Sequence, residues 1–267
     1  MADRPLILIT NDDGIDSPGL HAVAQAVADL GDLLIMAPST QQTGAGRSYP
    51  TNVDRTIFDT HVPLAKGRHP AYKAKVSPAQ AVALAIRELA QRPIDLCISG
   101  INFGENVGSG VTISGTVGAA IEAACFGIPA LAVSLETPTE YHLHHSDAID
   151  FTVAAQFTRF FAARVLERGL PEQVDLLKIE VPASATPETP WRTSRVSRQR
   201  YYQAAPTDHK ADRVVNRFSY QPYVDTELVE PDSDIYVFAV DKLVSVTPMT
   251  IDLTAPVELT TVTDFLT

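Results

Sequence analysis

The sequence has little positive charge for its size. Lysine and arginine together number 21, against 32 aspartate and glutamate residues, which gives a formal net charge of −11. Proteins that bind nucleic acid duplexes neutralise phosphates with clustered Lys and Arg, so this balance argues against such a partner. An anionic ligand would instead need a local positive element, such as a metal ion or a helix N-terminus.

Cysteine and long apolar runs are also scarce. Cys97 and Cys125 are the only cysteines, and each stands in an apolar stretch, which is typical of small core residues. The N-terminal run "LILIT" is too short for a signal peptide or a membrane span. We therefore expect a cytoplasmic protein that does not associate with membranes.

Three common catalytic and nucleotide-binding motifs are missing. There is no G-x-x-x-x-G-K-[ST] loop for a nucleoside triphosphate, and no G-x-G-x-x-G after the first strand for a dinucleotide. A G-x-S-x-G nucleophile elbow is also absent. The sequence thus argues against three of the large α/β enzyme classes.

Short apolar runs alternate with helical patterns over the first two thirds of the chain. A helix is expected from Pro18, with Ser17 as its N-cap residue and Gly31 after its last turn. This alternation predicts an α/β fold with a mainly parallel sheet. The expected strands cover residues 6–10, 32–38, 94–100, 128–135 and 175–182, and the expected helices cover 18–30, 77–89, 116–126 and 148–168.

The composition changes around residues 182–190, where "PASATPETP" predicts a turn-rich connector. Short strand-like pieces follow at 195–203 and 235–249, with Pro248 expected to close the pairing of the last one. We interpret residues 1–189 as the core and residues 190–267 as an extended β-rich arm.

Two adjacent carboxylates, Asp12 and Asp13, stand at the tip of the first expected strand. Like charges this close repel each other, so they either point to water or basic side chains, or share a hard divalent cation such as Mg²⁺ or Mn²⁺. Asn102 follows the strand at 94–100 and offers an amide oxygen. The hydroxyl of Thr43, in the loop "QQTGAG", is a further candidate ligand.

The stretch Ser114-Gly115-Thr116 directly precedes an expected helix. Unpaired N–H groups and the positive end of a helix favour a phosphate at such a position. The alternative is that Ser114 or Thr116 is an ordinary N-cap residue. Gly108, Gly110 and Gly115 would let the backbone approach a ligand closely.

Taken in order, these motifs resemble one family. The segments "ILITNDDGIDSPGL", "APSTQQTGAGRS", "SGINFGENVGSG", "SGTVGAAIEAACFGIPALAVS" and "VSVTP" are similar to those of the SurE family of metal-dependent 5'/3'-nucleotidases. The resemblance implies a Rossmann-like, three-layer α/β/α core and a C-terminal arm exchanged between subunits of a homodimer or homotetramer. It also implies one divalent metal ion per subunit, held by Asp12, Asp13, Thr43 and Asn102.

The phosphate would be bound by Asn106 and by Ser114, Gly115 and Thr116, with Asn11 and Gly44 beside them. On this basis we expect hydrolysis of nucleoside monophosphates, with Asp12 orienting or deprotonating water and Asn106 and Ser114 assisting catalysis. The alternatives are a nucleotide-binding module without turnover, and a phosphatase of polyphosphate or of generic phosphate esters.

The chain departs from the family pattern at three places. Thr43 stands where the family usually has Ser, which keeps the hydroxyl group. Ser109-Gly110 replaces one or two acidic residues, so no role of those acids carries over. Gln80 stands where Asp is common, which bears on substrate selection.

Two further clusters are interpreted without a catalytic role. The histidines of "HLHHSD", His142, His144 and His145, are expected in a solvated loop, because a structural zinc site normally gathers four ligands. A group of arginines precedes Tyr201-Tyr202 and is expected in a subunit-contact strand, with at most one reaching a neighbour's substrate phosphate. These arginines are Arg192, Arg195, Arg198 and Arg200.

Overall fold

The computed structural model describes residues 4–143, 145–204 and 220–267. At its centre is a nine-stranded sheet in the order β3-β4-β2-β1-β5-β6-β7-β11-β8. The strands of this sheet are β1 (Leu6–Thr10), β2 (Asp32–Pro38), β3 (Phe58–Leu64), β4 (Gly67–Ala74), β5 (Leu96–Phe103), β6 (Ala130–Leu135), β7 (Leu176–Val181), β8 (Trp191–Thr193) and β11 (Val244–Met249).

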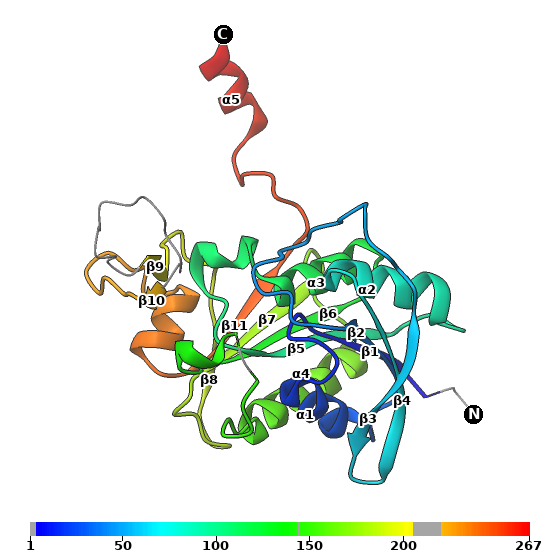
Figure 1. Cartoon of the computed structure of the whole chain (residues 1–267). Helices are drawn as coiled ribbons and strands as arrows, with labels where there is room; N and C mark the ends of the chain where they lie inside the picture. The colour runs from blue at the N-terminus through cyan, green and yellow to red at the C-terminus, as the bar shows by residue number, and fades with distance from the viewer. Residues whose placement is uncertain (1–3, 144, 205–219) are drawn as a thin grey trace, which may run out of the picture.

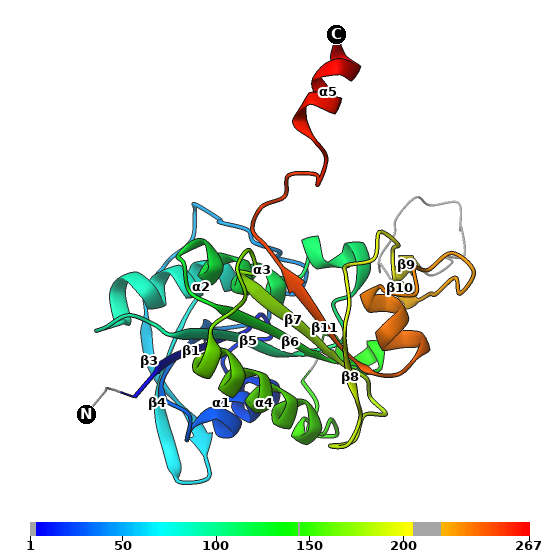
Figure 2. The same ribbon diagram turned by 180° about the vertical axis from the view of Figure 1, so that it is seen from behind.

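Helices cover both faces of the sheet. Helices α1 (Pro18–Val27) and α4 (Thr152–Arg168) lie on one face, and α2 (Pro78–Leu84) and α3 (Gly115–Cys125) lie on the other (Figures 1 and 2). Along β1, Ile7 packs with the α1 and α4 side chains, whereas Leu8 packs with those of α2 and α3. A parallel strand buried on both faces explains the continuous apolar run. The predicted Rossmann-like, three-layer core is confirmed.

The strand order reverses next to β1. From β1 the chain passes through α1 to β2 and on to β4, and then returns through α2 to β5 on the other side of β1. Strands β2 and β5 both pair with β1 in parallel. The carboxyl ends of β1 and β5 therefore meet at a topological switch point, which is where open α/β sheets bind ligands.

Several local expectations are wrong. Residues 58–74, which are not among the expected strands, form the antiparallel hairpin of β3 and β4. Tyr236–Val240, expected in a strand, is a helical turn. Pro248 does not close the pairing, because β11 continues to Met249 opposite Leu176. Ser17 is the N-cap residue of α1 as predicted, although its side chain makes no capping hydrogen bond.

The two cysteines also differ from each other. Cys97, in β5, is buried as expected. Cys125, at the last position of α3, is exposed, so its assignment to the core is wrong.

The C-terminal third of the chain joins the main sheet before leaving it. Strand β11 pairs with β7 and β8, and the predicted core-to-arm boundary falls in the connection between β7 and β8. A small second sheet is formed by β9 (Tyr202–Ala204) and β10 (Tyr220–Pro222). After β11 the chain runs away from the body and ends in α5 (Leu259–Leu266) (Figure 1). None of the helices in the described ranges has the length and apolar character needed to cross a membrane.

Candidate active site

Asp12 and Asp13 directly follow β1 at the switch point. Both are buried, with exposed fractions of 6% and 2%. Among the described residues neither carboxylate has a salt-bridge partner. The interpretation in which they point to water or to basic side chains is therefore wrong.

Burial of this pair disfavours its charge. Burial raises the pKa of Asp12 above its ordinary value, although hydrogen bonds, first of all from the Thr116 side chain, lower it in part. Burial, and then the charge of Asp12, raise the pKa of Asp13 well above its ordinary value. Two carboxylates that lack a counter-charge in the described structure form a site that a cation would stabilise.

Asn102 reaches the same place from β5. The register between β5 and β6 shifts between Ser99 and Asn102, and an irregularity of this kind re-aims a side chain at the end of a strand. The Asn102 amide nitrogen donates to the carbonyl oxygens of Phe103 and Gly104, at 3.2 and 2.7 Å. In the described part of the chain no group donates to its Oδ1 atom, which remains available as a ligand oxygen.

These donors suit a hard divalent cation. Two carboxylates, an amide oxygen and the hydroxyl of Thr43 are all oxygen ligands, the kind preferred by Mg²⁺ and Mn²⁺. The chemistry of the donor set thus fits the metal ion implied by the resemblance.

The first turn of α3 packs directly on Asp12. The Thr116 hydroxyl donates to Asp12 Oδ1 at 2.6 Å. A Cβ atom on Gly115 would lie 2.7 Å from Asp12 Oδ2, so only glycine permits this approach. The Ser114 hydroxyl accepts a hydrogen bond from the Val117 N–H at 3.1 Å, so the ordinary N-cap role is present at Ser114.

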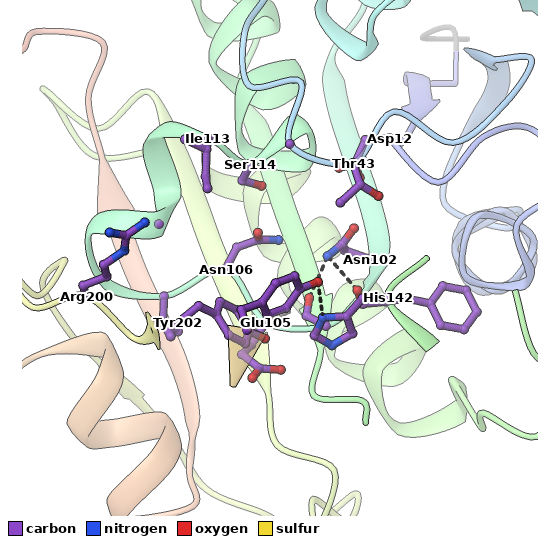
Figure 3. A pocket seen from close by; sticks show the side chains of 16 residues that line it. Asp12, Thr43, Asn102, Glu105, Asn106, Ile113, Ser114, His142, Arg200 and Tyr202 are labelled. Atoms are coloured by element: carbon purple, nitrogen blue, oxygen red, sulfur yellow. Dashed lines mark hydrogen bonds between the residues drawn. The ribbon is translucent and has the colours of Figure 1, made fainter. Parts of the chain in front are cut away.

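A cavity of about 290 Å³ opens beside these residues (Figure 3). Six of the predicted site residues line it, namely Asp12, Thr43, Gly44, Asn102, Asn106 and Ser114. The other four, Asn11, Asp13, Gly115 and Thr116, do not line it. Asn11 bonds through its amide group to the N–H and C=O of Gly14, so its side chain is used within the turn after β1.

The wall opposite the carboxylates was not predicted. It contains Glu105, His142, Arg200, Tyr202 and Tyr220, most of which are visible in Figure 3. Glu105 lies within the segment "SGINFGENVGSG" but was not selected as a site residue, and His142 and Arg200 belong to the two clusters interpreted without a catalytic role. Tyr202 and Tyr220 come from the short β9–β10 sheet.

The expectation of a solvated histidine loop is wrong for His142. This side chain is 6% exposed, and its ring nitrogens hydrogen bond to the Thr137 carbonyl oxygen and the Tyr220 hydroxyl, both at 3.1 Å. His145 Nε2 lies 2.9 Å from the Asp13 carbonyl oxygen. His144 lies outside the described residues.

The arginine cluster divides into two groups. Arg192 pairs with Asp241 and Arg195 with Asp232 within the chain. Arg200 lines the cavity of its own chain. An arginine of this stretch was expected to reach at most the substrate phosphate of a neighbouring subunit, whereas Arg200 lies at the cavity of its own chain. The subunit contact itself stays a prediction.

Gln41 links the carboxylate pair to the segment that carries His142. Its amide nitrogen donates to Asp13 Oδ1 at 3.0 Å and to the His142 carbonyl oxygen at 2.7 Å. Gln41 was not among the predicted site residues, although it lies only two positions before Thr43.

Comparisons with known proteins agree on one family. Residues 7–204 match a family model described as survival protein SurE. The "5'-nucleotidase SurE" of Thermococcus gammatolerans is 40% identical over 253 residues, covering 94% of this chain and 92% of that protein. The protein of the same name from Methanocella arvoryzae is 40% identical over 260 residues, covering 93% of each. The crystal structure of the SurE protein from Aquifex aeolicus superposes with a TM-score of 0.78 at 26% identity, over 98% of this chain and 100% of that one.

Proposed function

The chain belongs to the SurE family, and from that premise we propose that it is a 5'-nucleotidase, which hydrolyses nucleoside monophosphates to nucleoside and phosphate. The family is the one that the motifs predicted. The observation that carries the proposal is the buried Asp12–Asp13 pair, without a cationic partner in the described residues and next to the first turn of α3.

We propose that Asp12, Asp13, Thr43 and Asn102 hold one divalent cation per subunit, Mg²⁺ or Mn²⁺. When bound, such an ion supplies positive charge to the phosphate oxygens and lowers the pKa of water. Thr43 contributes the same hydroxyl donor as serine would.

The phosphate group is assigned to Asn106, Ser114 and the backbone N–H groups at the start of α3. The charge of a phosphoryl transition state is spread over three oxygens, and fixed N–H donors stabilise it without having to move. Asn106 is held for this task by its own amide nitrogen, which donates to Ser134 Oγ at 3.0 Å. Asp12 orients the attacking water or accepts its proton, since the Thr116 hydroxyl fixes one of its carboxylate oxygens.

Residues 190–267 are proposed to contact a second copy of the chain, giving a homodimer or homotetramer. Their last segment, after β11, carries large apolar side chains that this single chain leaves exposed. These are Leu253, Leu259, Val262, Phe265 and Leu266. A contiguous group of exposed apolar residues is typical of a protein interface.

The substitution Asp12→Asn tests the catalytic assignment. Asparagine keeps the oxygen that accepts from Thr116 but removes the charge, so we expect metal-dependent phosphate release to be lost while the melting temperature is retained. A colorimetric phosphate assay on a panel of nucleoside monophosphates, with Mn²⁺ or Mg²⁺ and with chelator, measures this. Near-normal turnover of the variant, or turnover by the wild type that chelator does not reduce, would contradict the assignment.

The same panel separates the alternatives. A wild-type protein that binds nucleotide but releases no phosphate is a binding module, which is the alternative motivated by Ser109-Gly110. Preference for polyphosphate or a simple phosphate ester would indicate a phosphatase of broader substrate class.

A further inference from the structure

A charged cluster lies buried behind the phosphate-binding side of the cavity. Lys178 and Glu180 belong to β7, and Asp234 lies just before the helical turn Tyr236–Val240. All three side chains have an exposed fraction of 0%. The Lys178 ammonium lies 3.0 Å from Asp234 Oδ2 and 3.4 Å from Glu180 Oε1. Such a cluster costs free energy to bury, because burial disfavours the charged form of each group, so we ask what its members hold in place.

Both carboxylates also bind the loop that follows β5. Glu180 Oε2 accepts the backbone N–H of Asn106 at 2.9 Å, and Asp234 Oδ2 accepts the N–H of Gly108 at 3.1 Å. Ser134, the register partner of Glu180 on β6, accepts from the Asn106 side chain. The main chain and the side chain of Asn106 are thus fixed from two neighbouring strands.

The loop is held on its other side by the C-terminal segment. Gly108 has a φ of +58°, and a Cβ atom there would lie 2.5 Å from the Gln199 carbonyl oxygen. The Ser109 N–H donates to that same oxygen at 2.9 Å. Asp234 Oδ1 accepts the N–H of Ser197 at 2.9 Å, so one carboxylate joins the C-terminal segment to the loop. The loop has no sheet partners of its own here, and these contacts replace them.

Lys178 supplies the counter-charge that the two carboxylates share. Burial raises the pKa of Glu180 above its ordinary value, and the charge of Lys178 lowers it in part. Burial alone lowers the pKa of the Lys178 ammonium, but the charges of Asp234 and then Glu180 raise it above the ordinary value. One cation serves two carboxylates, so without it two unpaired negative charges would face each other in the interior. N–H donors bind a charged carboxylate more strongly than a neutral group.

We propose that Lys178, through Glu180 and Asp234, is a positioning residue for the phosphate-binding loop of residues 105–108, and that it sets the place of Asn106. This inference rests on the proposed phosphomonoesterase function, in which Asn106 binds the phosphate. Lys178 itself does not line the cavity. It acts on substrate only through the loop.

Lys178→Met and Glu180→Gln test the proposal, and Ile179→Ala is the matched control. Methionine removes the cation at similar length, whereas glutamine keeps an acceptor for the Asn106 N–H and is the variant more certain to fold. Ile179 lies between them on β7 but packs with the α1 and α4 side of the sheet. Replacing Ile179 by alanine removes buried apolar atoms from the same strand and lowers the free energy of unfolding, but it leaves the contacts of Lys178 and Glu180 with the loop of residues 105–108 unchanged.

We expect Lys178→Met to raise KM and the inhibition constant of inorganic phosphate by roughly 10- to 100-fold, the range typical of lost outer-shell support, and Glu180→Gln to raise both less. Hydrogen–deuterium exchange of a peptide covering residues 104–109 should be faster in both variants than in Ile179→Ala, at temperatures the same distance below each melting point. The exchange readout needs no metal and no turnover.

The proposal is overturned if KM, the phosphate inhibition constant or the exchange rate of residues 104–109 changes no more than in Ile179→Ala. A wild-type protein that releases no phosphate would instead refute the proposed function. In that case the exchange of residues 104–109 alone decides whether Lys178 holds the loop.

Discussion

Glu105 is an acidic residue in the cavity wall that has no cation beside it. It is 4% exposed, and within the described ranges it makes no salt bridge and its Oε2 atom finds no hydrogen-bond partner. Burial, with smaller contributions from the charges of Glu136 and Glu180, raises the pKa of Glu105 to about 7. The carboxyl group is thus protonated in the folded protein over a pH range in which an unfolded chain has lost that proton.

This pKa predicts how Glu105 affects stability. The folded pKa of about 7 lies above the ordinary pKa of 4.5, so the stabilising contribution of the bound proton is complete below pH 4.5 and is lost as the pH rises through 7. Glu105→Gln, uncharged at every pH, should gain about 3 kcal/mol of unfolding free energy relative to wild type between pH 4.5 and pH 8.

Urea unfolding of both metal-free proteins at these two pH values measures the difference. The same pH dependence in wild type and variant would show that Glu105 does not titrate in this range.

At the residue scale, the sequence pattern identified polar residues that stand directly beside predicted strands and helices. Asp12 and Asn102 follow apolar runs, where a parallel sheet gathers them, and Ser114 precedes a helix. All three line the cavity. Gln41 and His142 could not be found this way. Their roles depend on a contact between two loops about a hundred residues apart, and no local periodicity records such a contact.

At the scale of elements, α3 shows how closely a helix approaches a functional side chain. Its first residue, Gly115, touches Asp12 with no room for a methyl group. The chemistry of the site therefore depends on the packing of this helix against the end of β1.

The substitution Gly115→Ala should lower kcat/KM by roughly 100-fold, because displacement of a reacting group by about 1 Å has this order of effect. A matched control is Gly127→Ala just beyond the other end of α3, since a Cβ atom there meets nothing within 4 Å and Gly127 does not line the cavity, so its positive φ of +75° affects stability alone. Steady-state kinetics and melting temperatures of both variants test this. Equal kinetics in the two would show that Asp12 tolerates the added methyl group.

Element types were predictable where length and capping signals agreed. The helix from Pro78 has Ser77 and Gln80 as a reciprocal capping box, and it lies where the sequence placed it. The run "IYVFAV" was assigned to a strand as a short apolar piece, yet Tyr236–Val240 forms a helical turn. Short apolar runs fit either structure, and here the packing of Ile235 and Phe238 into a separate small core decides the outcome.

At the scale of the whole molecule, the segment after β11 exposes large apolar side chains that a second subunit would bury. Thr250 and Ile251 are anchored to Asp175, whereas the residues that follow leave the body (Figure 2). Leu253 and Phe265 are 92% and 85% exposed. Burying such side chains in a second subunit would contribute about 25 cal/mol per Å² of apolar surface.

A chain that ends after Asp252 should therefore be a monomer, because it keeps the anchor at Asp175 but loses the apolar tail. Light scattering coupled to size-exclusion chromatography, at equal protein concentrations, compares it with the full chain. Full-length protein carrying Phe265→Ser and Leu266→Ser should show the same loss of mass. If all three proteins have the same mass, the tail is not the contact.

The fold as a whole was the most predictable property, since alternating strands and helices leave few topologies. The hairpin of β3 and β4 was not predictable, because its strands are largely exposed and carry no continuous apolar run.

The link between Asp234 and Gly108 has a consequence for biosynthesis. A ribosome adds residue 106 long before residue 234, so a nascent chain acquires the whole proposed metal-ligand set while its loop still lacks one of the two anionic anchors. Activity toward substrate should thus arise only after Asp234 has emerged from the ribosome. Amino-terminal fragments left by interrupted translation would be inactive even if they bind the ion.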